Sequence, residues 1–200
     1  MTAIAVLASG RGTNLLALHR AVEAGELPGS LALVASDREA PALRWAGDEG
    51  IKTFFADARQ IGMVEWERRL LEALAASQAD LIVLAGFMRV LSPDFVGRFR
   101  DRIVNVHPSL LPAFPGMDAI GQALAHGVKV TGVTVHFVDE GLDAGPIILQ
   151  EAVEVREGEP RAELEARMHA VEHRLLPRAV GLLSLGRLEV RGRIVHILEG

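Results

Sequence analysis

Short apolar runs alternate with amphipathic segments through the first half of the sequence. The apolar runs have the length and composition of buried strands and comprise residues 3–8, 31–36, 53–55, 81–85 and 103–107. Between several of them lie segments with apolar residues at helical spacing, at residues 14–24, 42–49 and 64–77. Strands that are apolar along their whole length are typical of parallel sheets covered by helices on both faces. The pattern therefore predicts a single-domain α/β fold around a mostly parallel, twisted sheet.

The second half of the sequence predicts longer strands and one long helix. Its strand-like segments are residues 132–138, 146–155, 188–190 and 194–198. The first two are expected in the same sheet, with antiparallel pairing left open, and the last two as a closing hairpin. A helical pattern covers residues 160–185, from Pro160 to the stop signal Gly186. Pro177 lies inside this pattern and predicts a kink or a break.

Composition limits the class of protein. Two hundred residues suit one domain with a substantial core. The net charge is −5 and the basic residues form no stripe, so nucleic acid is not expected as the main partner. The absence of cysteine excludes disulfides, thiolate catalysis and cysteine metal ligands, and it fits a cytoplasmic location. Residues 1–8 lack the basic start of a signal peptide, and a glycine-rich segment ends the apolar run, so we expect neither a signal peptide nor a membrane span.

A glycine-rich loop joins the first predicted strand to the first predicted helix. It consists of Ser9, Gly10, Arg11, Gly12, Thr13 and Asn14. Glycines let backbone amides approach an anion, and Thr13 or Asn14 can cap the helix or donate to a phosphate. The loop does not match the dinucleotide-binding fingerprint, because Leu15 stands where that motif has its last glycine. It does not match a P-loop either, because no Gly-Lys-Ser/Thr follows. The spacing alone leaves a phosphate site and an ordinary tight turn equally open.

The strand at residues 103–107 carries two polar side chains near its end. Asn105 and His107 are two positions apart and therefore project from the same face, and Pro108 ends the strand. Open α/β folds build their sites at such strand ends. A second polar cluster, residues 139–146, follows another apolar strand and includes Asp143. We expect the carboxylate of Asp143 to meet the amide and the imidazole in one pocket.

These three groups suit acyl or formyl transfer to an amine. Asn105 can donate to the tetrahedral oxyanion, and His107 can share proton transfer or stabilise charge. Asp143 can raise the proton affinity of the imidazole or accept a proton through a bound water. None of the three is a strong nucleophile here, so direct transfer is the expected mechanism. The alternative is that Asn105 and His107 are ordinary caps or satisfied polar groups.

Nearly the whole chain resembles the phosphoribosylglycinamide formyltransferases, folate-dependent enzymes of purine synthesis. The motifs that carry the resemblance lie at residues 8–15, 84–93, 105–112, 132–138 and 142–150. The His-Pro-Ser-Leu-Leu-Pro core at residues 107–112 is also shared with methionyl-tRNA formyltransferase and formyltetrahydrofolate deformylase. The resemblance implies a Rossmann-like formyltransferase domain over residues 1–200, with a phosphate-binding half (1–100) and a catalytic and folate-binding half (101–200).

The resemblance also implies a role for each matching residue. The catalytic set would be Asn105, His107 and Asp143. The substrate phosphate and ribose would be held by Gly10, Arg11, Gly12, Thr13, Asn14 and Glu172. The co-substrate 10-formyltetrahydrofolate would be bound by Met88, Arg89, Val90, Leu91, Val138, Asp139, Glu140, Gly141 and Asp143. No metal is implied, and the expected partners are these small molecules, with neither nucleic acid nor membrane, for a monomer or a homodimer.

Several of these residues have a simpler interpretation. Met88, Val90 and Leu91 have the composition of plain core. The guanidinium of Arg89 needs an acceptor, which is either a folate carboxylate or a nearby residue such as Asp94. Taken alone, Glu172 is typical of a solvated helix face.

Three further positions stay open. His136 either borders the site or is a buried, hydrogen-bonded histidine. Asp118 stands where several relatives place a histidine, so the substrate contact of that loop is expected to differ. His169 stands where some relatives place a lysine near the phosphate, and a neutral histidine would contribute less charge and make phosphate binding more dependent on pH.

Three alternative functions share features with this sequence. A deformylase would use water as the acceptor, and relatives of that type carry a preceding regulatory domain, whereas the first strand is expected at Ala3. A methionyl-tRNA formyltransferase would need a further C-terminal domain and a basic surface, whereas this sequence ends at Gly200 and is acidic. A non-catalytic sugar-phosphate-binding module would be favoured by loss of a catalytic residue, and all three are present.

Overall fold

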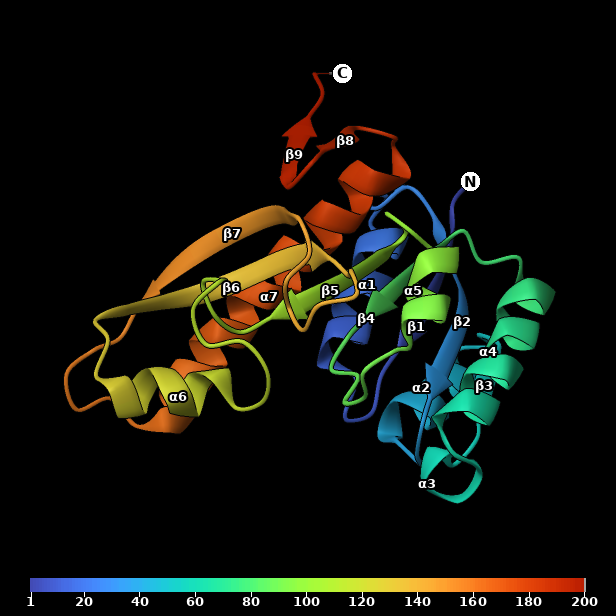
Figure 1. Cartoon of the computed structure of the whole chain (residues 1–200), viewed down its shortest axis with the longest axis horizontal. Helices are drawn as coiled ribbons and strands as arrows, with labels where there is room; N and C mark the ends of the chain where they lie inside the picture. The colour runs from blue at the N-terminus through green and yellow to red at the C-terminus, as the bar shows by residue number, and fades with distance from the viewer. Residues whose placement is uncertain (200) are drawn as a thin grey trace.

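A single sheet of nine strands runs through residues 1–199, the part of the chain that this computed structural model describes (Figure 1). The spatial order is β3-β2-β1-β4-β5-β6-β7-β9-β8. The strands are β1 (Ala3–Leu7), β2 (Ser30–Ser36), β3 (Thr53–Phe55), β4 (Leu81–Leu84), β5 (Ile103–His107), β6 (Val130–Phe137), β7 (Ile147–Glu154), β8 (Leu188–Arg191) and β9 (Ile194–Ile197). The first five strands are parallel, and β6 and β7 pair antiparallel with the preceding strand.

Helices cover both faces of the parallel part. Side chains on one face of the strands, such as Val6 and Val83, pack with α1 (Thr13–Glu23), α2 (Pro41–Asp48) and α7 (Arg161–Ser184). The alternate residues, such as Leu7 and Ile82, pack with α4 (Met63–Ser77) and α5 (Pro93–Arg98) on the other face. Because both faces are buried, these strands are apolar at every position, which is the feature that predicted the parallel sheet.

The predicted strands and helices are confirmed with boundary differences of one or two residues. Three short helices were not predicted: α3 (Ala58–Ile61), α5 and α6 (Ala119–His126). They have too few turns for an apolar period to stand out. The closing hairpin is present as β8 and β9, which project from the rest of the sheet (Figure 1).

Of the kink or break predicted at Pro177, a break is excluded, because α7 continues through this residue. A proline inside a helix removes one backbone hydrogen bond, at a cost of about 3 kcal/mol. Here Leu176, Ala179 and Val180 are fully buried on either side of it. Burial of this helix face offsets the missing bond. None of the helices in residues 1–199 combines the length and apolar character that crossing a bilayer requires.

Candidate active site

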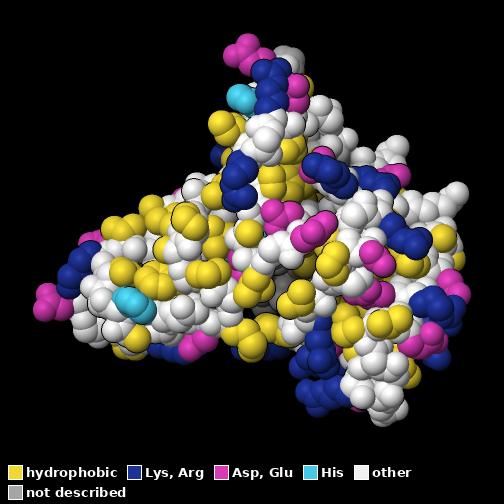
Figure 2. All heavy atoms as spheres, viewed as in Figure 1, with side chains coloured by type: hydrophobic (Ala, Val, Ile, Leu, Met, Phe, Trp, Pro, Cys, Tyr) yellow, Lys and Arg dark blue, Asp and Glu magenta, His cyan; other side chains and the backbone are white. Residues whose placement is uncertain are grey.

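The site lies at the point in the sheet where the order of the strands reverses. From β1 the chain moves outward to β2 and β3 and then returns to β4 on the other side of β1. At such a switch point, loops leave neighbouring strand ends in opposite directions and open a crevice. The loops after β1 and β4, together with the end of β5, therefore meet at one edge of the sheet. Figure 2 shows a hollow near the middle of one face of the molecule, bordered by hydrophobic side chains.

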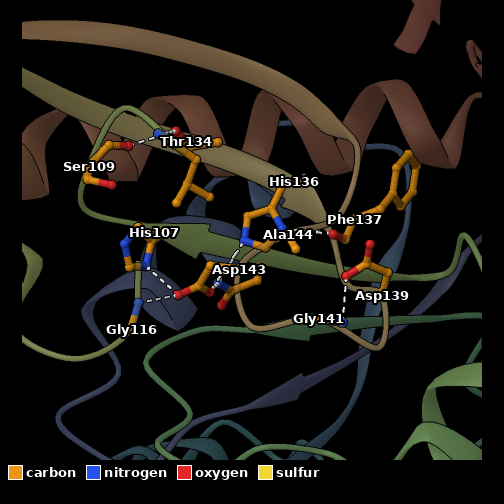
Figure 3. Close-up of polar contacts among 12 residues, drawn as sticks. His107, Ser109, Gly116, Thr134, His136, Phe137, Asp139, Gly141, Asp143 and Ala144 are labelled. Atoms are coloured by element: carbon orange, nitrogen blue, oxygen red, sulfur yellow. Dashed lines mark hydrogen bonds and ion pairs between the residues drawn. The ribbon is translucent and has the colours of Figure 1, made fainter. Parts of the chain in front are cut away.

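Asn105, His107 and Asp143 come together from two separate segments. Figure 3 shows the imidazole of His107 facing the carboxylate of Asp143. Asp143 Oδ2 accepts a hydrogen bond from the backbone N–H of Gly116 at 2.7 Å and lies 3.4 Å from His107 Nδ1. Its other oxygen, Oδ1, lies 3.5 Å from Asn105 Nδ2. The side chains of His107 and Asp143 are 6% and 12% exposed, so they interact with little competition from solvent.

Both ring nitrogens of His107 face oxygen acceptors. Nε2 lies 2.8 Å from the carbonyl oxygen of Phe114, which can only accept, so Nε2 carries a hydrogen and donates it. Nδ1 faces the carboxylate of Asp143. A doubly protonated imidazole would donate to both oxygens. The arrangement therefore suits a histidine that carries positive charge beside a carboxylate at some stage of a reaction.

His136 both borders this group and is a buried, hydrogen-bonded histidine, so both interpretations left open for it apply. It is buried, and its Nδ1 donates to the carbonyl of Phe137 at 2.7 Å, so Nε2 of the neutral ring accepts from Asn105 Nδ2 at 3.1 Å. Burial lowers the pKa of His136, which favours this neutral form. The contact arises because His136 pairs directly with Asn105 across β5 and β6. That register was not available from the sequence.

The glycine loop leads directly into the N-terminus of α1. Gly12 is the N-cap of α1 with φ 80°, and an added Cβ would lie 2.9 Å from the Cβ of Ala42, so the position requires glycine. Of the two roles left open for Thr13 and Asn14, capping of α1 is excluded, because the helix has no side-chain cap. Donation to a phosphate stays a prediction. Gly10, Arg11 and Thr13 are exposed.

Asn14 turns inward to Glu172. Asn14 Nδ2 donates to Glu172 Oε2 at 2.8 Å, and this hydrogen bond links the first helix to the last. Glu172 is only 6% exposed, so the interpretation as a solvated helix residue is wrong. Burial raises the pKa of Glu172, and the hydrogen bond from Asn14 opposes that rise.

The segment expected to bind folate is a loop between β4 and α5. Met88 and Val90 are 59% and 73% exposed, so the interpretation as plain core is wrong for both, whereas Leu91 is buried in the core. Arg89 Nε donates to Asp37 at 2.9 Å, so its guanidinium has an aspartate as acceptor, although this is Asp37 and not the suggested Asp94.

The remaining expected folate residues follow β6. The backbone N–H of Val138 donates to the carbonyl of Ile103, and Asp139 accepts from the backbone of Gly141 at 3.0 Å. Glu140 and Gly141 are exposed. These residues form a turn that faces solvent, which can present backbone groups to a ligand.

Asp118 and His169, the two positions expected to differ from relatives, both contact other side chains. Asp118 caps α6 by accepting from Gly121 and pairs with Arg161 at the start of α7, 2.7 Å away. His169 lies beside His173, with ring centroids 6.2 Å apart.

Comparison with known proteins identifies the family. Residues 2–180 match the model of the family described as formyl transferase. Phosphoribosylglycinamide formyltransferase of Mycobacterium tuberculosis strain H37Rv is 43% identical over 191 residues, which cover 95% of this chain and 88% of the relative. The corresponding Bacillus subtilis enzyme is 39% identical over 182 residues, which cover 90% of this chain and 93% of the relative.

Solved structures agree with these relatives. Glycinamide ribonucleotide transformylase 1 from Symbiobacterium toebii superimposes with a TM-score of 0.96 at 47% identity and covers 100% of this chain and 95% of its own. A formyltetrahydrofolate deformylase from Pseudomonas syringae has a TM-score of 0.91 at 27% identity, and the match covers 100% of this chain and 67% of that one. The chain belongs to the phosphoribosylglycinamide formyltransferase family of formyl transferases.

Proposed function

We propose that this chain transfers the formyl group of 10-formyltetrahydrofolate to the amine of 5′-phosphoribosylglycinamide in purine synthesis, by direct transfer. The observation that carries the proposal is the meeting of Asn105, His107 and Asp143 at one edge of the sheet. The family membership supplies the pair of substrates.

The reaction needs a donor to an oxyanion and a route for one proton. The amine nitrogen attacks the formyl carbon, and the carbonyl electrons move to oxygen to give a tetrahedral intermediate. Asn105 Nδ2 donates to that oxygen. One N–H of this amide makes the short contact with His136, and the other makes the long contact with Asp143. The N–H on the Asp143 side is therefore the one free to turn toward the intermediate.

Collapse of the intermediate breaks the bond between the formyl carbon and the folate nitrogen. The former amine gives up a proton, and the departing nitrogen gains one, so the exchange balances. His107, between Phe114 and Asp143, stabilises the developing charge and shares the proton transfer. Asp143 holds the ring and accepts a proton through water.

The two substrates occupy the two sides of this group. On one side, the backbone and side chains of residues 10–14 hold the phosphate at the start of α1, and Glu172 binds the ribose hydroxyls. On the other side, residues 88–91 and 138–143 enclose the folate heterocycle. The exposed side chains of Met88 and Val90 supply apolar surface for a flat ring.

The test supplies one formyl donor with three acceptors. Purified protein is incubated with 10-formyltetrahydrofolate and glycinamide ribonucleotide, methionyl-tRNA, or water alone, and both tetrahydrofolate release and acceptor formylation are measured. We expect release to require glycinamide ribonucleotide and to match its formylation one to one. Equal release of tetrahydrofolate in water alone would assign a deformylase instead. Formylation of the amine of methionyl-tRNA would assign a methionyl-tRNA formyltransferase.

A further inference from the structure

The loop between β5 and α6, residues 108–118, contributes two backbone groups to the proposed catalytic set. The carbonyl oxygen of Phe114 lies 2.8 Å from Nε2 of His107. The backbone N–H of Gly116 donates to Oδ2 of Asp143 at 2.7 Å (Figure 3). The orientation of the imidazole and of the carboxylate therefore depends on where this loop holds its backbone.

Apolar burial does little to fix the part of this loop around Gly116. Pro115 is exposed and Met117 is 79% exposed, while Phe114 is only partly buried. Side chains that stay in water contribute little hydrophobic stabilisation, which scales with the apolar area removed from solvent. The position of this segment therefore depends on its polar contacts.

The side chain of Gln122, on α6, holds two backbone carbonyls of this segment. Its Nε2 donates to the carbonyl oxygen of Met117 at 2.9 Å and to that of Pro115 at 3.3 Å. The residues on both sides of Gly116 are thus tied to one side-chain amide. Gln122 is itself fixed, because its backbone N–H donates to the carbonyl of Asp118 in the first turn of α6.

The longer of these two contacts reaches the peptide group that serves Asp143. The carbonyl of Pro115 and the N–H of Gly116 belong to one planar, trans peptide unit, in which they point in opposite directions. Gln122 therefore binds the oxygen of this unit on one side, and Asp143 binds its N–H on the other. Hydrogen bonds in such a chain polarise one another, so donation from Gln122 strengthens the N–H as a donor to the carboxylate.

We propose that Gln122 is a positioning residue for formyl transfer, which keeps the carboxylate of Asp143 turned toward His107. The inference rests on the proposed function. Gln122 acts through the peptide between Pro115 and Gly116 and not by touching the substrates. Without the amide donors this peptide is free to rotate, and Asp143 loses its shortest hydrogen bond. The carboxylate, now 3.4 Å from Nδ1 of His107, then spends less time beside the imidazole.

The test removes the donors of Gln122 and keeps the length of the side chain. For Gln122→Met we expect kcat for formylation of glycinamide ribonucleotide to fall roughly tenfold, the scale of one lost hydrogen bond. Both KM values should stay unchanged, because neither substrate loses a contact. Gln60→Met, the same change at an exposed position on α3, is the matched control and should behave as wild type.

A second readout does not depend on catalysis. Hydrogen exchange of the Gly116 amide, followed by NMR, should be slowed in the wild type by its bond to Asp143. In Gln122→Met we expect this exchange to become roughly tenfold faster, because the peptide opens more often. The amide of Val106, inside β5, should exchange at the wild-type rate in both proteins, which distinguishes local opening from global unfolding.

The outcomes separate the two proposals. If wild-type protein formylates no glycinamide ribonucleotide, the proposed function fails, and exchange at Gly116 still decides whether Gln122 holds the peptide. If the wild type is active, the positioning role is rejected when Gln122→Met leaves kcat unchanged or leaves exchange at Gly116 unchanged. Gln122→Glu, which turns a carboxylate toward two carbonyl oxygens, should lower kcat at least as far. This second variant decides the question if the methionine variant does not fold.

Discussion

Replacement of Asp143 by asparagine removes one charge at the centre of the proposed chemistry. In the wild-type protein, the carboxylate of Asp143 accepts a hydrogen bond from the backbone N–H of Gly116 and faces His107 and Asn105. An asparagine keeps one oxygen, which we expect to stay with the Gly116 N–H, the shortest of these contacts. The charge beside His107 is then lost, and with it the stabilisation of an imidazolium. A general acid–base contribution is worth roughly 100- to 10,000-fold in kcat, or about 3 to 5 kcal/mol of barrier.

The assay measures kcat and both KM values for Asp143→Asn with saturating co-substrate, and the free energy of unfolding by urea denaturation. We expect kcat to fall within that range while the protein stays folded, because the oxygen for Gly116 is retained. Asp48→Asn, the same change at an exposed position on α2, is the control and should behave as wild type. A kcat within a few-fold of wild type in a folded Asp143→Asn protein would refute the role of the carboxylate.

Three further results are expected. Asn105→Ala should raise the activation free energy of formyl transfer by about 3 kcal/mol, the scale of one oxyanion donor. If steady-state kinetics showed a change in KM alone, Asn105 would be a ground-state binding residue. The pKa of His136 lies below its ordinary value of 6.5, so unfolding takes up a proton as pH falls below about 6.5 and wild-type stability should decline there. His136→Gln should flatten that decline in urea titrations at several pH values, and an identical slope would exclude His136 as its source. Gly145→Ala should destabilise the fold by roughly 1–3 kcal/mol, because the added Cβ would collide with the carbonyl of Phe137; an unchanged melting temperature would contradict that geometry.

The parallel half of the fold could be predicted because its strands are buried on both faces. Continuous apolar runs such as β4 mark the sheet directly, and the helices between them have enough turns to show their period. Asn105 and His107 could be placed on one face by strand alternation alone. Whether Asp143 lies beside them depends on the three-dimensional fold. The residue pattern suggested that fold, and the family resemblance assigned Asp143 to the same catalytic set.

The residues missed by the sequence share one property, which is that their environment depends on pairing between distant strands. Asp37 stands in a short charged segment, Ser36 to Glu39, that has the composition of an ordinary exposed turn. It is buried because β2 lies beside β1, so that Ser9 and Arg89 close over it. His136 becomes a partner of Asn105 only through the register of β5 and β6. No local pattern carries that information.

The antiparallel direction of β6 explains why the position of Asp143 depends on the backbone of its loop. Phe137, the last residue of β6, pairs with Val104 near the start of β5, so the chain leaves β6 at the end of β5 that is farther from His107. The loop must therefore fold back for Asp143 to reach His107. Gly145 makes this possible because it lies against the carbonyl of Phe137 where no Cβ fits. Asp143 itself has φ 49°, a left-handed conformation that aspartate and asparagine tolerate better than most residues. Asparagine at 143 thus changes the charge and keeps the loop, which is why that substitution, more than alanine, separates chemistry from folding.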